Sequence, residues 1–445
     1  MLSTTGETQP QNIITEKENL RREIGVRALT LAILNIIVGT GIFLLPALIS
    51  EKLGAASIIA YIVCGALISL IALCFAECGS KVTVTGGTYA YIEAAFGPFA
   101  GFIANNIFWF GACVFADAAV AAGLADTLKL IMPSLASTEI FRIVFFAVLF
   151  GVMALINITS VKNGVRFIEL AAFGKLIPLL LFVIVGIGFV STKNLAFTSM
   201  PALTDVGSAS LLLFFAFIGM ETPVTNGGEI KNPQRTIPRA IFFGILLVLI
   251  LYIAIQLVTQ GILGNAILQN RTAPLAAAAG IIFGTAGATI ILIATIISML
   301  GYIGGEVLSI PRVLYAGARN RQLPKLFANV HPKFQTPHYA IIVYAFLDFV
   351  VSAAGQLQQL VIIASAAMLF IYLGVVLSTI KLRYKKSIAD ETSFKIPGGI
   401  IIPLLAAAVI IWLLAHLSRK EFLYAGIFIA IICVVYFIMQ LVKKR

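Results

Sequence analysis

The sequence predicts an all-α membrane protein with about twelve transmembrane helices. Of its 445 residues, 60% are hydrophobic and only 11% are charged, and the mean hydropathy is +1.03. A typical soluble domain carries about 25% charged residues, so this composition excludes a soluble globular protein. Apolar runs long enough to cross a bilayer recur along the whole chain, and Lys and Arg gather in alternate connections between them.

The apolar runs place the expected helices. A window of about 19 residues separates twelve of them. The polar connections between them are too short for a soluble domain, and the longest cover 77–97, 309–338 and 381–399. The expected spans are 28–50, 54–76, 98–124, 139–158, 167–190, 208–228, 238–263, 276–308, 339–354, 358–380, 400–416 and 422–441.

The distribution of basic residues predicts the orientation. With the N-terminus inside, 23 Lys and Arg fall on the inner side and seven on the outer side. The positive-inside rule then places both tails, 1–27 and 442–445, in the cytoplasm of a multi-pass inner-membrane protein. A patch for nucleic acid would gather on one surface instead of recurring in every second loop, so we expect no nucleic-acid partner.

The cysteines and the N-terminal region indicate little special chemistry. The five cysteines form an odd number without metal-ligand spacing, so we expect buried apolar side chains instead of disulfides, a metal site or a cofactor site. The polar residues before the first span lack an apolar core with a cleavage site, so we expect no cleaved signal peptide. Neither H-E-x-x-H nor G-x-S-x-G occurs, and we expect no enzyme.

The first span is interrupted at its centre, where Ile36–Phe43 reads I-I-V-G-T-G-I-F. Each glycine costs about 1 kcal/mol relative to alanine inside a helix. Backbone groups freed in hydrocarbon cost several kcal/mol more, so a break is tolerated where it lines a cavity. Its amides can then hold an anionic group such as a carboxylate. Alternatively, Gly39 and Gly41 only let two helices pack closely.

The sixth span repeats this irregularity. Gly219, Glu221 and Pro223 interrupt the apolar run Leu212–Val224. Paired interrupted segments, one in each half of a chain, indicate a secondary transporter with inverted repeats and a binding site near the bilayer midplane.

Four stretches then carry a family resemblance. They run from Val38 to Pro46, from Thr85 through Tyr91 to Phe102, from Phe217 through Glu221 to Pro238, and from Gly304 to Pro324. Together they resemble the amino acid–polyamine–organocation (APC) superfamily of transporters. The nearest likeness is to bacterial arginine/agmatine exchangers and to cationic and L-type amino acid transporters.

The resemblance implies a leucine-transporter-like fold that works by alternating access, with amino acids or related amines as substrates. Two inverted repeats of five helices are followed by two extra helices. The implied units are a first repeat over 28–190, a second repeat over 208–380 and the two extra helices over 400–441.

Five ionisable residues are expected inside the membrane, where each charge costs about 2.5–3.5 kcal/mol on insertion scales. They are Asp117, Lys175, Glu221, Glu306 and Asp348. The Lys175 ammonium can replace a bound sodium ion and can exchange a proton, or it is a static tether to carbonyls of the first span. Glu221 resembles the glutamate that sets the pH response of the arginine/agmatine exchanger, or it accepts a hydrogen bond from a neighbouring helix.

The other acidic residues bear on the substrate. Asp117 would share a helical face with Cys113 and attract a cationic group, or it pairs with Lys175 or another helix. Glu306 stands where the exchangers often carry a tryptophan gate, so it is expected to bind a cation or a proton, or to pair with Lys175. For Asp348 we expect a role in packing.

We therefore predict a sodium-independent secondary transporter of amino acids or amines, with a preference for cationic substrates, acting as an exchanger or a proton symporter. The alternative is a membrane nutrient receptor that does not transport. Lys175, Glu221 and Glu306 are the expected proton-coupling and gating residues, Phe215 is the aromatic gate or ordinary core filling, and a homodimer remains open. The expected substrate-binding residues are Val38, Gly39, Thr40, Gly41, Ile42, Trp109, Cys113, Asp117, Phe215, Ala216, Phe217, Ile218, Gly219 and Glu306.

Overall fold

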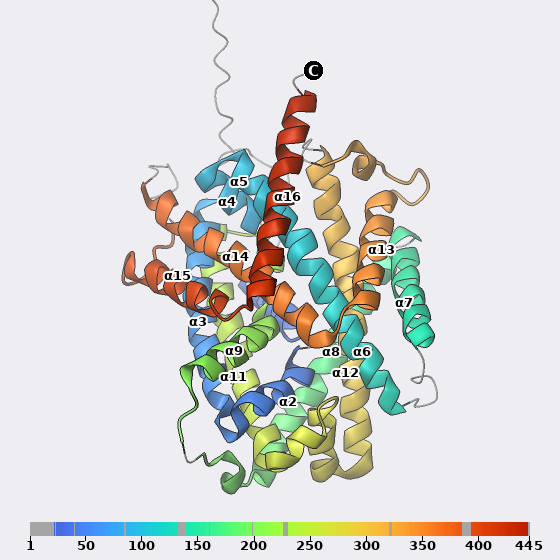
Figure 1. Ribbon diagram of the computed structural model, residues 1–445, viewed down its shortest axis with the longest axis vertical. Helices are drawn as coiled ribbons and strands as arrows, with labels where there is room; N and C mark the ends of the chain where they lie inside the picture. Colours follow the sequence, from blue (N-terminus) through green and yellow to red (C-terminus); the bar gives the residue numbers. More distant parts are fainter. Residues whose placement is uncertain are drawn as a thin grey trace, which may run out of the picture.

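The protein is helical along its described length (Figure 1), as seen in a computed structural model. Those residues contain no β-strand, only an isolated bridge between Ile24 and Ile230. The structure describes residues 22, 24–39, 41–83, 86–131, 139–159, 161–197, 199–225, 230–319, 323–384 and 393–443.

The first half of the chain supplies the first five spans. Its elements are α1 (Val26–Ile37), α2 (Gly41–Leu53), η2 (Gly54–Ala56), α3 (Ser57–Lys81), α4 (Thr88–Phe96), α5 (Pro98–Asn106), the π-helix η3 (Ile107–Val114), α6 (Phe115–Ile131), α7 (Glu139–Thr159), α8 (Val161–Gly186), η5 (Ile187–Phe189) and η6 (Thr192–Leu195).

The second half supplies the remaining spans. Its elements are α9 (Leu203–Phe214), η7 (Phe215–Phe217), α10 (Glu221–Val224), α11 (Pro233–Leu263), η9 (Gly264–Gln269), α12 (Pro274–Arg319), η10 (Lys325–Ala328), α13 (His338–Ala354), α14 (Leu357–Tyr384), α15 (Ile401–Leu414) and α16 (Arg419–Lys443).

These helices account for each of the twelve predicted spans and confirm the all-α membrane fold. Eight helical segments of the described chain are long and apolar enough to cross a bilayer, and shorter apolar helices supply the remaining spans. Two boundaries differ from the prediction. Helix α12 continues to Arg319 instead of ending near residue 308, with Pro311 inside it, and the connection 77–97 contains α4. A proline removes only one helical hydrogen bond, and the surrounding structure can compensate for it.

Both predicted interruptions are present. Helix α1 ends at Ile37 and α2 begins at Gly41. Helix α9 ends at Phe214, and after the turn η7 the chain is extended at Ile218 and reaches φ +127° at Gly219 before α10 begins. Neither the first nor the sixth span is therefore a continuous helix.

The packing brings these broken spans to the centre of the bundle. Helix α11 packs against α3 and α1, α9 packs against α2 and α3, and α14 packs against α6 and η3. The short helices α4 and α5 lie at the same end of the molecule as the C-terminal end of α16 (Figure 1).

Candidate functional site

The two helix breaks lie directly against each other. A Cβ atom at Gly41 would lie 2.8 Å from the Ala216 Cα atom, and a Cβ atom at Gly219 would lie 2.7 Å from Ile36 Cγ2. At Gly219 the positive φ independently favours glycine. The glycines therefore serve both roles considered from the sequence, because they interrupt the helices and also allow the close approach.

Tyr252 of α11 joins the two breaks from a third helix. Its hydroxyl lies 2.7 Å from the Ile37 carbonyl oxygen and 2.9 Å from the Ala216 carbonyl oxygen. Both acceptors lie where a helix has ended, so they lack the usual helical donor. The sequence analysis missed this residue, although a tyrosine within an apolar span was a signal, because a buried hydroxyl needs a partner.

A small cavity of about 30 Å³ lies beside the breaks. This volume holds only a few water molecules and is too small for an amino acid. The cavity is lined by Ile36, Ile37, Gly39, Gly41, Phe108, Ala112, Cys113, Ala116, Val120, Phe215, Ala216, Ile218, Gly219, Glu221, Thr222, Tyr302, Glu306 and Met368.

The start of α2 lies at the cavity. The first amides of a helix have no intrahelical partner, and the helix dipole adds partial positive charge there. Gly41, the first residue of this 13-residue helix, lines the cavity. At the other break the Gly219 amide donates to Glu221 Oε2 at 3.2 Å. The α2 start is therefore the end of the break where an anionic group would meet a helix dipole.

The two carboxyl groups that line the cavity differ in their bonding. Glu221 Oε2 accepts a hydrogen bond from the Tyr372 hydroxyl at 2.5 Å in addition to the one from Gly219. Glu306 interacts with the thiol of Cys113. The geometry of Glu221 is that of an acceptor for a neighbouring helix, whereas Glu306 lines the cavity without an ion-pair partner among the described residues.

Asp117 does not line this cavity. Its Oδ2 accepts a hydrogen bond from the Tyr344 hydroxyl of α13 at 3.0 Å. Asp348 lies on α13 as well, one turn after Tyr344. Both aspartates are fully buried. Of the alternatives left open for Asp117, the structure places it with another helix instead of with Lys175.

Lys175 of α8 contacts the first span. Its Nζ donates to the carbonyl oxygen of Asn35 at 2.7 Å, two residues before the end of α1. Lys175 is 6% exposed, and no ion pair joins it to Glu306. This is the contact expected of a tether to the first span, and it also places one positive charge beside the break.

The other predicted residues divide into two groups. Cys113, Phe215, Ala216 and Ile218 line the cavity. Val38, Ile42 and Phe217 are buried outside its lining, Trp109 donates to Asn106 Oδ1 at 3.0 Å, and Thr40 lies outside the described residues.

The sequence analysis missed several cavity residues on the third and eighth spans, among them Phe108, Ala112 and Tyr302. The π-helix η3 contributes the first two. π-Helical turns are rare and often mark functional sites, but they change which residues share a face. A sequence pattern read as an ordinary α-helix cannot give that face correctly.

The loop after α3 contacts the end of the sixth span. The Gly86 amide donates to the Thr225 carbonyl oxygen at 2.9 Å. A Cβ atom at Gly87 would lie 2.9 Å from the Thr225 Cγ2 atom, so a larger residue at Gly87 would disturb this contact.

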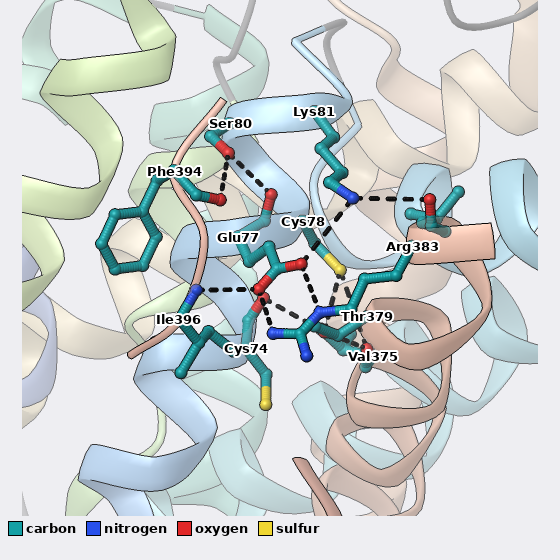
Figure 2. Close-up of polar contacts among 11 residues, drawn as sticks. Cys74, Glu77, Cys78, Ser80, Lys81, Val375, Thr379, Arg383, Phe394 and Ile396 are labelled. Atoms are coloured by element: carbon teal, nitrogen blue, oxygen red, sulfur yellow. Dashed lines mark hydrogen bonds and ion pairs between the residues drawn. The ribbon is translucent and has the colours of Figure 1, made fainter. Parts of the chain in front are cut away.

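A second group of buried charges lies at the ends of α3 and α14 (Figure 2). We call Glu77, Lys81, Arg383 and the Ile396 amide the Glu77 cluster. Arg383 donates to both oxygens of Glu77, at 2.7 and 2.5 Å. The Ile396 amide donates at 3.0 Å and the Lys81 ammonium lies 3.7 Å away. Both oxygens of the Glu77 carboxylate therefore have donors, and a buried charge needs such partners to be stable.

Comparison with known proteins agrees with this architecture. Residues 24–437 match the family described as amino acid permease. The chain belongs to that family. It is therefore a multi-pass membrane transporter of the APC superfamily, not an enzyme, as the sequence motifs predicted.

The relatives extend over nearly the whole chain. The serine/threonine exchanger SteT of Bacillus subtilis (strain 168) is 29% identical over 94% of this chain and 96% of its own length. The methylthioribose transporter of the same organism is 27% identical over 95% of this chain and 94% of its own. The b(0,+)-type amino acid transporter 1 of Mus musculus is 25% identical over 96% of this chain and 89% of its own.

Proposed function

We propose that the protein carries amino acids or closely related amines across the membrane by alternating access without sodium. One observation carries this proposal: the two helix breaks lie together beside a cavity, and the start of α2 lines it. The substrate carboxylate would lie on the amides near Gly39 and Gly41, where the helix dipole favours negative charge. The expanded cavity would form when the bundle opens, because the closed cavity is too small for an amino acid.

The substrate side chain would extend toward η3 and α12. Cys113, Tyr302 and Glu306 line that part of the cavity. With Glu306 ionised, its free acceptor capacity favours a cationic end group, so a cationic amino acid is the first candidate. A small neutral amino acid is the second candidate, because the cavity is small and one relative is named a serine/threonine exchanger.

Lys175 supports the absence of a sodium requirement. Its ammonium bonds to the Asn35 carbonyl oxygen, at the end of a broken helix where carbonyl groups could otherwise coordinate a cation. One fixed positive charge there would take the place of the ion. We expect uptake by the wild-type protein to be equal in sodium and choline buffers. Uptake by Lys175→Ala should fall at least about tenfold, the loss expected when about 1.4 kcal/mol of stabilisation disappears.

Exchange is the mechanism that we propose first, with proton symport as the alternative. The fixed charge of Lys175 needs no co-transported ion, and one relative is named an exchanger. In proteoliposomes an exchanger takes up labelled substrate only when unlabelled substrate is inside. Uptake into empty vesicles that follows an imposed proton gradient would instead establish symport, with Lys175, Glu221 and Glu306 as the groups to test.

Substrate identity can be tested by thermal unfolding of the purified protein with a panel of amino acids and polyamines, since a bound ligand raises the apparent stability. We expect stabilisation by cationic amino acids, and stabilisation only by small neutral ones would favour the second candidate. A ligand that stabilises the protein but is not transported in proteoliposomes would contradict the transporter proposal and indicate a nutrient receptor.

Orientation and repeat organisation are part of the same proposal. Inverted repeats over 28–190 and 208–380 would place the two breaks at equivalent positions, and both termini would be cytoplasmic in the inner membrane. The inner-side excess of basic residues supports this orientation. Membrane-impermeant labelling of a cysteine placed in either tail should fail in intact cells and succeed after lysis. Native mass spectrometry would decide between a monomer and a homodimer.

A further inference from the structure

A groove on the outer face of the bundle, separate from the central cavity, has a volume of about 750 Å³. Sites that bind small molecules have volumes of about 300–1,000 Å³. Three segments form its walls: α3, α11 and the stretch 393–397. The groove is lined by Ser69, Ala72, Leu73, Ala76, Gln234, Arg235, Pro238, Arg239, Ile241, Phe242, Phe243, Ile245, Leu246, Leu249, Ser393, Phe394 and Pro397.

The α11 wall changes from basic to apolar along its length. Arg235, Arg239, Phe242, Leu246 and Leu249 follow one another at spacings of three and four residues, so they share one face of the helix. Phe242 is 58% exposed and Leu246 is 42% exposed, as expected for a surface that faces hydrocarbon. The two arginines occupy the first two turns of the helix, where a long basic side chain can reach the head-group layer.

The other two walls, α3 and the stretch 393–397, explain why the groove is not filled by side chains. On α3 the groove is lined by the small residues Ser69, Ala72 and Ala76, which leave space beside the large side chains of α11. The third wall is fixed by the Glu77 cluster, since the Ile396 amide donates to Glu77 and the Ser80 hydroxyl contacts the Phe394 carbonyl oxygen. Figure 2 shows the Phe394 ring directed away from the cluster.

The positive charge at the basic end of the groove indicates an anionic ligand. Arg235 and Arg239 are both exposed, and the described part of the chain offers neither of them an ion-pair partner. Basic pockets between transmembrane helices bind anionic lipid head groups. We propose that this groove binds an anionic phospholipid, whose phosphate lies between the two arginines and whose acyl chain lies along Phe242, Leu246 and Leu249.

Native mass spectrometry and thermal unfolding of the purified full chain, titrated with phosphatidylglycerol or phosphatidylcholine, test this proposal. We expect the wild-type protein to retain phosphatidylglycerol and to gain thermal stability from it, with a much weaker response to phosphatidylcholine. The double variant Arg235→Ala/Arg239→Ala should weaken phosphatidylglycerol binding roughly tenfold or more, because each basic side chain near an anionic surface adds to the attraction. Both side chains are exposed, so this variant should fold.

Two further variants distinguish specific binding in the groove from nonspecific electrostatic attraction of anionic lipid to the protein. Lys231→Ala/Lys325→Ala removes the same charge from exposed residues outside the groove and should leave lipid binding unchanged. Leu246→Trp should fill the groove and lower lipid retention while keeping both arginines. Equal binding of the two lipids, or an equal loss in the lysine control and the arginine variant, would overturn the proposal. None of these readouts depends on transport, so they do not test the proposed function.

Discussion

Two buried carboxyl groups, Glu77 in the Glu77 cluster and Glu306 at the central cavity, differ in the partners that the protein gives them. Glu77 is 1% exposed and is paired by Arg383, Lys81 and the Ile396 amide. Glu306 is 9% exposed and lines the cavity, and no ion pair joins it to a cation within the described part of the chain. Both carboxyl groups are shielded from bulk water. At Glu77, donors from Arg383 and Ile396 replace the lost water molecules.

This difference in partners indicates a structural role for Glu77 and a functional role for Glu306. A buried charge with a complete set of donors stabilises one arrangement of the chain, and removing a partner is costly. A buried carboxyl group with spare acceptors remains unsatisfied until a ligand or a proton arrives. The Glu77 cluster should therefore hold α3, α14 and the stretch 393–397 together, whereas Glu306 should respond to substrate. Four substitutions test this contrast, in order of decreasing effect on stability.

The largest effect is expected for Arg383→Ala. This change leaves the Glu77 carboxylate buried without its two strongest donors, which should cost about 3–5 kcal/mol of unfolding free energy. Thermal unfolding in detergent measures the loss. Lys129→Ala is the control, because the Lys129–Asp126 pair is 41% and 37% exposed and should contribute at most about 1 kcal/mol. Equal shifts for the two variants would contradict a structural role of the cluster.

Gly41→Ala should have the next largest effect. The added methyl group would meet Ala216 at the point where the two helix breaks touch, and overpacking of this kind costs about 1–3 kcal/mol. Substrate uptake should be nearly abolished because the breaks are forced apart. Gly151→Ala makes the same change in α7 with nothing within 4 Å of the new atom. That control should retain both uptake and stability, and a similar loss there would remove the steric explanation.

Tyr252→Phe removes only the hydroxyl that contacts both breaks. The Ile37 and Ala216 carbonyl oxygens would lose their shared donor. The Ile37 oxygen keeps the Gly39 amide as a donor, so the cost should be about 1–2 kcal/mol, most of it from Ala216. We expect a lower unfolding temperature together with slower uptake. Tyr424→Phe, at a position that is 63% exposed, should change neither. A silent Tyr252→Phe would show that the breaks hold their positions without this bridge.

Glu306→Gln should have the smallest effect on stability and a large one on substrate choice. Its carboxyl group makes few contacts inside the protein, so the unfolding free energy should change by about 1 kcal/mol or less. Competition assays should show preference for lysine over serine falling about tenfold, since one charge pair is lost. A loss of stability as large as that of Arg383→Ala, with unchanged substrate preference, would place Glu306 with the structural carboxylates.

Much of the architecture could be predicted from the sequence. The apolar runs predicted all twelve spans. The glycines near Thr40 and at Gly219 marked both interruptions, because glycine weakens a helix interior, and at Gly219 the positive φ also favours it. The cavity was harder to derive. Gly39, Gly41, Cys113, Phe215 and Glu306 were predicted and line it. Several of the residues that were missed, among them Phe108 and Ala112, lie on the π-helix η3, which changes the side of the span that faces the cavity.

The partners of the charged residues were beyond sequence reasoning. Asp117 could have faced a cationic substrate or paired with Lys175 or another helix, and only the structure shows its bond to Tyr344. Glu77 and Arg383, separated by 306 positions, gave no sequence signal of their pairing. Local pattern shows that a charge is buried, but its partner is set by the packing of distant helices.

By itself the sequence determined that this chain crosses a membrane about twelve times and that its first and sixth spans are broken, because hydropathy and glycine act locally along the chain. Only the tertiary structure decided that the two breaks touch, that the start of α2 lines the cavity, and that Glu77 pairs with Arg383 whereas Glu306 faces the cavity. Those outcomes depend on how helices far apart in the sequence share the space between them, and on which donors come within hydrogen-bonding distance of each buried carboxyl group.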